Sequence, residues 1–199
     1  LRKDFPTNKD CCKHKVFQRC SRSSLYLTLG WDKISGASGY RVYKYNSSKK
    51  TYESVVTLSG GSVTSYKVTG LKDATEYKFK VKAYKKVNGE TVWGSASSEY
   101  KTCTTPLKVK NLKLSTKSSA VTLKWGKTSG STGYELYRYN RKTKKYEKIA
   151  TINSGSTVSY TDKNLKKGTT YQYKVRAYKK YENSTFYGVC STVTKITVK

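Results

Sequence analysis

The stretch LKDATEYKFKVKAYKK occupies residues 71–86, and LKKGTTYQYKVRAYKK occupies residues 165–180, 94 positions later. In each copy a Leu is followed six residues later by a Tyr, and from there apolar or aromatic residues alternate with polar ones. Alternation with a period of two is typical of a β-strand with one buried face and one solvated face. Because the stretch occurs twice, the sequence predicts two domains of one all-β type.

The alternation assigns each residue of these two strands to a face. The expected inner residues are Tyr77, Phe79, Val81 and Ala83 in the first copy, and Tyr171, Tyr173, Val175 and Ala177 in the second. The expected outer residues are Lys78, Lys80, Lys82 and Tyr84 in the first copy, and Gln172, Lys174, Arg176 and Tyr178 in the second. Each strand therefore combines an aromatic inner row with a mostly cationic outer row.

The repeat divides the 199 residues into two domains of ordinary size. We expect domain 1 over residues 21–105 and domain 2 over 106–199, with a register of 94 that aligns Trp31 with Trp125. Residues 1–20 lack clear periodicity and are expected to form an irregular, Cys-containing extension that runs into a weak first strand. In the first domain, turns rich in Gly, Ser and Asn separate strands expected at 25–31, 40–45, 52–58, 63–68, 77–86 and 91–102.

The composition restricts the kinds of partner. The net charge is +29, and it is shared, with 20 Lys and Arg against 8 Asp and Glu before Pro106 and 21 against 4 after it. Such a surface attracts any polyanion in a salt-dependent way. No apolar run approaches the roughly 20 residues that a membrane-spanning helix needs. The absence of Met indicates a processed product or an excised fragment.

An ordered set of motifs resembles the fibronectin type III domain. The set comprises Trp31 and Trp125, the pattern G-Y-x-[VL]-Y-x-Y at 39–45 and 133–139, the pairs Leu71–Tyr77 and Leu165–Tyr171, and the Ala-Tyr-Lys-Lys endings. The Leu–Tyr pairs are similar to the tyrosine corner, in which a Tyr hydrogen-bonds to backbone a few residues upstream. The resemblance is to tandem copies in secreted and wall-associated proteins of Gram-positive, gut-type bacteria. It implies two seven-stranded antiparallel β-sandwiches, used at the cell surface or outside the cell as spacer, adhesion or binding modules.

The cysteines leave several alternatives open. Cys11, Cys12, His14 and Cys20 could be grouped as a zinc site, but their spacing fits no common zinc pattern, and disulfides are favoured. In a tandem of such sandwiches, Cys103 lies at the end of the last strand of domain 1, and Cys190 lies near the start of the last strand of domain 2. A disulfide between them across the short linker is one hypothesis. Pairing with the N-terminal cysteines, or no pairing, is the other.

The sequence offers little support for catalysis. The single His lies outside both repeats, and we find no nucleotide-binding loop, metalloprotease helix or calcium-binding loop. We therefore predict a protein that is not an enzyme and uses no cofactor and no metal.

The strongest candidate for a binding surface is the outer face of the two central strands in each domain. Its residues are expected to be Arg41, Tyr43, Tyr45, Lys78, Lys80, Lys82 and Tyr84 in domain 1, and Tyr137, Tyr139, Lys174, Arg176 and Tyr178 in domain 2. One interpretation is cross-strand packing of lysine stems on tyrosine rings. The other is a site for an anionic or sugar polymer.

The setting implied by the resemblance favours an anionic cell-wall polymer, a glycan or a protein partner. Nucleic acid is expected to bind only non-specifically, because Lys outnumbers Arg 34 to 7 and base-edge readers favour Arg. The functional prediction is an extracellular structural or binding module that spaces or presents partner domains. A subunit of a surface assembly, self-associating through the N-terminal extension, and a dedicated carbohydrate-binding protein are the alternatives.

Overall fold

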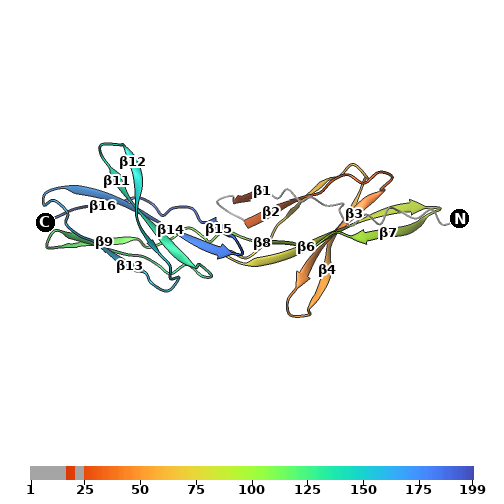
Figure 1. Ribbon diagram of the computed structural model, residues 1–199, viewed down its shortest axis with the longest axis horizontal. Coiled ribbons are helices and arrows are strands. Elements are labelled where there is room, and N and C mark those ends of the chain that lie inside the picture. The colour runs from red at the N-terminus through yellow and green to blue at the C-terminus, as the bar shows by residue number, and fades with distance from the viewer. Residues whose placement is uncertain (1–16, 21–24) are drawn as a thin grey trace. The chain divides into compact units, whose positions relative to one another are not determined.

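The structure of the protein is a computed structural model, and it describes residues 17–20 and 25–199 (Figure 1). In these ranges every helix or strand assigned is a β-strand, and none of the described segments forms a helix that could cross a membrane. The chain divides into two compact units, of which the first includes Glu76–Thr104 and the second Thr105–Lys199. The predicted all-β class is confirmed.

The first unit consists of two antiparallel sheets. The smaller sheet has the order β1-β2-β5, with bounds Phe17–Cys20, Leu25–Gly30 and Ser65–Val68. The larger has the order β4-β3-β6-β7, with bounds Thr51–Ser59, Gly39–Asn46, Glu76–Val87 and Glu90–Ala96; β8 (Tyr100–Cys103) also pairs with β6. The weak first strand expected at the end of the extension is therefore β1, which pairs with β2.

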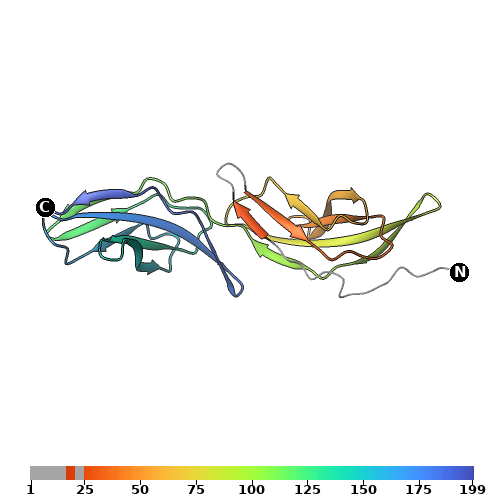
Figure 2. The ribbon, with the colours of Figure 1, turned by 90° about the horizontal axis from the view of Figure 1, so that it is seen from above.

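The second unit repeats this topology. Its smaller sheet has the order β13-β10-β9, with bounds Ser159–Asp162, Ala120–Lys124 and Lys113–Lys117. Its larger sheet has the order β12-β11-β14-β15, with bounds Lys145–Ile152, Gly133–Asn140, Thr170–Tyr181 and Ser184–Tyr187; β16 (Thr194–Thr197) also pairs with β14. In Figure 2 the long strand of each unit, β6 or β14, runs along its unit and ends in a hairpin turn.

The last strand of each domain differs from its prediction. Instead of one strand over 91–102, the chain forms β7 and β8, which pair in succession with β6. Between them, Ser97 accepts a hydrogen bond from the Val81 N–H through its Oγ at 3.0 Å and donates its own N–H to the Val81 carbonyl at 2.9 Å. Ser191 makes the same exchange with Val175. A serine hydroxyl thus replaces one backbone acceptor, which splits the seventh strand without leaving a buried N–H unpaired.

The inner faces form one core in each domain. Trp31 and Tyr40 are 5% and 1% exposed, and their rings meet at 5.5 Å between centroids. Trp125 and Tyr134 repeat the pair at 5.4 Å. The other predicted inner residues of the long strands are buried, except that Tyr77 and Tyr171 are half-buried and pack against the edge of the core.

The tyrosine corners are present, with Leu71 and Leu165 buried beside them. Tyr77 Oη accepts a hydrogen bond from the Lys72 N–H at 2.8 Å, and Tyr171 Oη accepts one from the Lys166 N–H at 3.1 Å. In both corners the tyrosine hydroxyl is therefore the acceptor and the upstream backbone is the donor.

The structure records no disulfide at Cys103 or Cys190, and the bond hypothesised between them stays a prediction. Cys103 is fully buried at the end of β8, where its Sγ lies 3.3 Å from the carbonyl oxygen of Thr104. The grouping of Cys11, Cys12, His14 and Cys20 lies outside the residues whose side chains are described.

Candidate binding face on the large sheets

The outer face of the larger sheet carries the predicted site residues in both domains. We use "outer face" for the side of β3, β4, β6 and β7, or of β11, β12, β14 and β15, that points away from the core. Backbone pairing sets Arg41 opposite Lys82 and Tyr43 opposite Lys80. The structure thus brings together, on one surface, residues that are about 40 positions apart in the chain.

One end of the outer face of domain 1 is a cluster of tyrosines and lysines. Tyr45 on β3 and Tyr52 on β4 are cross-strand partners whose rings lie 5.2 Å apart. Lys78 Nζ lies 5.2 Å from the Tyr45 ring centre, and Lys80 Nζ lies 4.7 Å from that of Tyr52. Both distances allow cation–π attraction, which is modest at half-exposed positions. The ammonium groups of both lysines therefore lie over tyrosine rings.

Glu99 neutralises part of this cluster. Its carboxylate accepts a short hydrogen bond from the Tyr52 hydroxyl and lies 3.4 Å from Lys78 Nζ and 4.0 Å from Lys101 Nζ. The Tyr52 hydrogen bond and the two lysines hold the pKa of Glu99 below its usual value, although burial opposes this. Burial, together with the hydrogen bond to Glu99, raises the pKa of Tyr52. The phenol therefore stays protonated and acts as a donor.

The other end of the outer face of domain 1 is organised around Arg41. Its Nε donates to Thr57 Oγ1 at 2.7 Å, and its guanidinium lies 4.2 Å from the centre of the Trp93 ring. Tyr84 is the cross-strand partner of Trp93, and the two ring centres lie 5.1 Å apart. Arg41 is therefore fixed in one orientation by a hydrogen bond and a stacked ring.

Tyr84 and Tyr178 differ from the prediction that they are exposed members of the binding face. They point outward, as the alternation requires, yet they are only 7% and 2% exposed. Each ring covers a glycine on the neighbouring strand, so a Cβ at Gly39 or Gly133 would lie 2.6 or 2.5 Å from the tyrosine Oη. These tyrosines pack the sheet and offer little surface to a ligand.

In domain 2 the outer face has a carboxylate at its centre. Glu135 is 4% exposed, and its oxygens accept hydrogen bonds from Tyr137 at 2.6 Å, Lys148 at 3.0 Å and Arg176 Nε at 2.8 Å. Burial of Glu135 disfavours its charged form, but the three donors outweigh burial and hold its pKa below the usual value. Arg176 also lies 4.0 Å from the centre of the Tyr187 ring. The cations at this position are therefore already paired.

The tyrosine–lysine cluster of domain 1 has a counterpart in domain 2. Tyr139 and Tyr146 lie 5.2 Å apart, and Lys174 Nζ lies 4.2 Å from the centre of the Tyr146 ring. The Tyr146 hydroxyl donates to Gln172 Oε1 at 3.1 Å, where domain 1 has Lys78 and Glu99. The cluster of domain 2 thus has Gln172 at the position of Lys78 and carries one cation fewer than the cluster of domain 1.

Sequence reasoning missed several members of these faces. Glu135 lies on a central strand, β11, and the others lie outside the two central strands of each sheet. These others are Tyr52, Thr57, Trp93 and Glu99 in domain 1, and Tyr146, Lys148 and Tyr187 in domain 2. Glu135 could have been found, because it precedes Tyr137 and Tyr139 in the same outward row. Glu99 could not, because it lies in the break between β7 and β8, where no periodicity applies.

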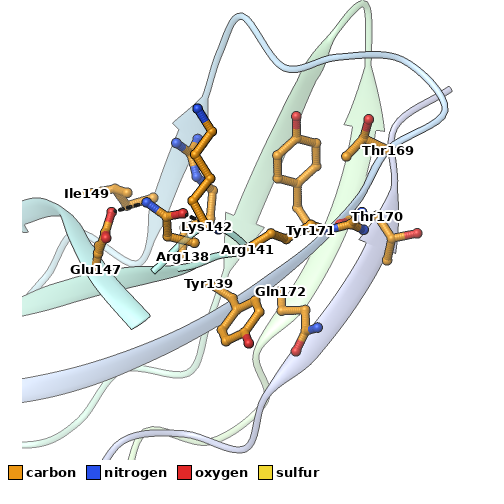
Figure 3. Close-up of a pocket in the computed structure, with 11 residues that line it drawn as sticks. Arg138, Tyr139, Arg141, Lys142, Glu147, Ile149, Thr169, Thr170, Tyr171 and Gln172 are labelled. Carbon is orange, nitrogen blue, oxygen red and sulfur yellow. Dashed lines mark hydrogen bonds between the residues drawn. The ribbon is translucent and has the colours of Figure 1, made fainter. Parts of the chain in front are cut away.

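A cavity of about 430 Å³ lies at one end of domain 2, beside the β11–β12 turn (Figure 3). Three cations line it, namely Arg138, Arg141 and Lys142. In Figure 3 Tyr139 and Gln172 project to one side of the sheet, and Tyr171 projects to the other. Arg138 is bound to Asp162 at 2.8 Å, and Arg141 donates to the Thr170 carbonyl at 3.0 Å. Because these two charged groups are held by neighbouring groups, the outer face remains the stronger candidate.

The described residues show no metal centre. Over residues 17–20 and 25–199, no group of three or more His, Cys, Asp or Glu side chains gathers closely enough to hold an ion. The outer faces themselves carry charged, hydrogen-bonding and aromatic side chains.

The chain is similar to segments of longer proteins. It is 32% identical over 162 residues to a Kelch domain-containing protein of Saccharolobus solfataricus, covering 79% of this chain and 21% of that protein. It is 28% identical over 163 residues to neogenin of Rattus norvegicus, covering 76% of this chain and 11% of neogenin. The chain thus spans about a fifth or less of the length of these relatives. They are archaeal and animal proteins, so the bacterial setting stays a prediction.

A two-domain segment of chicken tenascin shares the fold, with a TM-score of 0.54 at 16% identity, over 95% of this chain and 99% of that one. The family model for the fibronectin type III domain matches residues 16–99 and 107–187, which together make up most of the chain. The sandwich topology, the two tyrosine corners and this match agree: the chain belongs to the fibronectin type III family, as a tandem of two domains.

Proposed function

We propose that this protein is a non-catalytic extracellular or cell-surface module whose outer faces bind an anionic polymer or glycan while the two domains space or present their neighbours. The observation that carries the proposal is the group of cations Arg41, Lys78, Lys80 and Lys82, which project from the paired strands β3 and β6. Cations held by stacked rings lose less side-chain entropy on binding than free surface lysines.

The proposed partner follows from the charge of these faces. A net charge of +29 favours polyanions, and rows of tyrosine beside lysine suit a sugar or polymer chain that offers apolar ring surfaces between anionic groups. The predominance of Lys over Arg argues against sequence-specific reading of nucleic acid, for which we propose only non-specific binding. The cell-surface setting is proposed from the family resemblance.

The salt dependence of binding tests this proposal. Binding of a sulfated and of a uronate oligosaccharide is measured between 20 and 200 mM salt, conditions over which ionic contacts weaken steeply (about one unit of logarithmic slope per contact). Changing Lys78, Lys80 and Lys82 to Gln should reduce the slope by about two to three units. The matched control changes the exposed Lys50, Lys72 and Lys85 to Gln, which removes the same charge elsewhere. Equal slopes in the two triple variants would contradict a site on the outer face.

A protein partner or self-association is the second candidate. It rests on the three cysteines of the N-terminal segment, Cys11, Cys12 and Cys20, which leave an odd thiol available for a bond between chains. Electrophoresis of the native protein without reductant checks it. A dimer that reductant converts to monomer supports the assembly role. A monomer with and without reductant argues against a covalent assembly.

A further inference from the structure

Two cations face one another on the outer face of domain 1. Arg41 on β3 is the direct cross-strand partner of Lys82 on β6. Side chains in such pairs have their Cβ atoms about 4.5–5.5 Å apart, and like charges at that distance destabilise the sheet. No carboxylate contacts either residue among the ion pairs of the described chain. The pair therefore leaves a local excess of positive charge on an ordered surface.

Domain 2 shows how the same position is neutralised from within. Glu135 stands at the position of Arg41, 94 residues later, and Arg176 stands at that of Lys82. There the cross-strand pair is an ion pair of 2.7 Å, reinforced by Lys148 at 3.0 Å. Domain 1 thus has two like charges at this cross-strand position, whereas domain 2 has a carboxylate bound by two cations, with Arg176 in place of Lys82.

Arg41 is oriented before any ligand arrives. Its Nε is occupied by Thr57 Oγ1 and its plane lies against Trp93, so the terminal Nη atoms remain as donors. Arg41 and Lys82 are each half-buried, which strengthens their interaction with an anion relative to bulk water. The carboxylate of Glu99 is already shared among Tyr52, Lys78 and Lys101 at the far end of the face.

We infer that domain 1 alone carries the principal anion-binding site of this protein, formed by Arg41 and Lys82 beside Trp93, and that domain 2 is closed to the same ligand by Glu135. The inference rests on the proposed function and assigns it to one domain. The ligand group is an oxyanion, a sulfate ester or a carboxylate, attached to an extended glycan. Two donors of an oriented guanidinium together with one ammonium match the oxygens of such a group.

The first experiment exchanges charge at position 41. Arg41→Glu places a carboxylate opposite Lys82 in domain 1, as Glu135 stands opposite Arg176 in domain 2. Binding of a sulfated tetrasaccharide and of a uronate tetrasaccharide is measured by calorimetry at 50 mM salt, and the two ligands distinguish the two sources of the oxyanion. We expect Arg41→Glu to weaken binding of the preferred one about tenfold or more. Lys50→Glu, which changes net charge equally on an exposed turn, should weaken it about twofold or less.

The second experiment opens domain 2. Glu135→Gln removes the internal carboxylate and leaves Arg176 and Lys148 unneutralised, so the number of tetrasaccharides bound per chain should rise from one to two. The indole ¹H–¹⁵N signals locate the sites in parallel. Trp31 and Trp125 are core residues, whereas Trp93 lies on the outer face. In the wild type only the Trp93 signal should shift on titration, and in Arg41→Glu it should not.

The outcomes separate the inference from the proposed function. If neither tetrasaccharide binds the wild type, both fail. If one tetrasaccharide binds the wild type and the triple variant of Lys78, Lys80 and Lys82 binds it more weakly, the proposed function stands. The inference is then overturned if Arg41→Glu binds as well as Lys50→Glu does, or if the wild type already binds two tetrasaccharides per chain. A Trp93 signal that stays in place while ligand binds overturns it as well.

Discussion

The hydroxyl of Tyr77 accepts a hydrogen bond from the backbone N–H of Lys72, five residues upstream and at 2.8 Å. The donor lies at an exposed position, so water can replace the tyrosine when the hydroxyl is removed. A buried acceptor left unpaired would cost more. The direction of this hydrogen bond therefore determines how much the tyrosine corner contributes to the stability of its domain.

Tyr77→Phe and Tyr171→Phe are each expected to lower the free energy of unfolding of their own domain by about 0.5–1.5 kcal/mol, the range for one net hydrogen bond. Thermal unfolding should show one transition shifted in each variant. Tyr43→Phe serves as the control, because no hydrogen bond of the Tyr43 hydroxyl is found among residues 17–20 and 25–199. A control shift as large as that of Tyr77→Phe would show that the corner is not a specific stabilising contact.

Gly39→Ala and Gly133→Ala should destabilise their domains more strongly than the corner variants. A Cβ at Gly39 would lie 2.2 Å from the Leu58 carbonyl oxygen, and one at Gly133 would lie 2.0 Å from that of Ile152. Overpacking of this kind costs about 1–3 kcal/mol or more. Calorimetry should show that each substitution lowers one transition only, which assigns the two transitions to the two domains.

A double variant at Gly39 tests which neighbouring group excludes a side chain at that position. Because the closest atom is a backbone oxygen, truncating the tyrosine ring should not restore stability. Gly39→Ala combined with Tyr84→Leu is therefore expected to be no more stable than Gly39→Ala alone. Recovery in the double variant would show that the ring of Tyr84, and not the neighbouring strand, is what excludes a side chain at position 39.

Domain 2 should lose stability in acid through Glu135. The pKa of Glu135 is lower in the folded protein than the value of about 4.3 expected for an unfolded chain. Its contribution to stability is therefore complete above the unfolded pKa and is lost as pH falls through the folded one. The transition assigned to domain 2 should shift downward below about pH 4.3 by more in the wild type than in Glu135→Gln.

Glu135→Gln also carries a cost at neutral pH. It leaves Lys148 and Arg176 without their carboxylate, and we expect a loss of about 1–3 kcal/mol, less than for a fully buried pair because both cations are partly exposed. Melting curves from pH 3 to pH 7 measure both effects. Parallel curves for the wild type and the variant over that range would show that Glu135 does not couple domain 2 to pH.

Cys103 and Cys190, the two cysteines whose side chains the structure describes, should differ in reactivity. Cys103 is 0% exposed, whereas Cys190 is partly exposed. Alkylation of the native protein should therefore label the peptide that contains Cys190 well before the peptide that contains Cys103, which reacts once domain 1 unfolds. Peptide mapping after timed alkylation measures this order. Equal rates would contradict the burial of Cys103.

Local pattern was enough to predict much of the fold. The alternation around Tyr77 and Tyr171 predicts which side chains enter the core, because a strand has a side-chain period of two and only one face can leave water. The repeat of 94 residues predicts that both domains share one topology. The outward direction of Arg41, Tyr43 and Lys82 follows from the same rule.

The split of the final strand could not be predicted in this way. Its cause is a hydrogen bond between Val81 and Ser97, which are 16 residues apart, and a serine in a β-rich stretch gives no local sign that it will replace a backbone acceptor. The burial of Tyr84 has a similar origin. Alternation predicts that it points outward, but only the pairing of β3 with β6 places it over Gly39 and under Trp93.

The sequence by itself determined the fold class, the two domains and the sign of their charge, because periodicity and composition are properties of neighbouring residues. Only the tertiary structure decided which cations are paired. Arg41 and Glu135 stand in the same row of the same motif, and their effect depends on Lys82 and Arg176, which lie 41 residues further along the chain and meet them across a strand. Electrostatic energy depends on distance in space, and register across strands sets that distance.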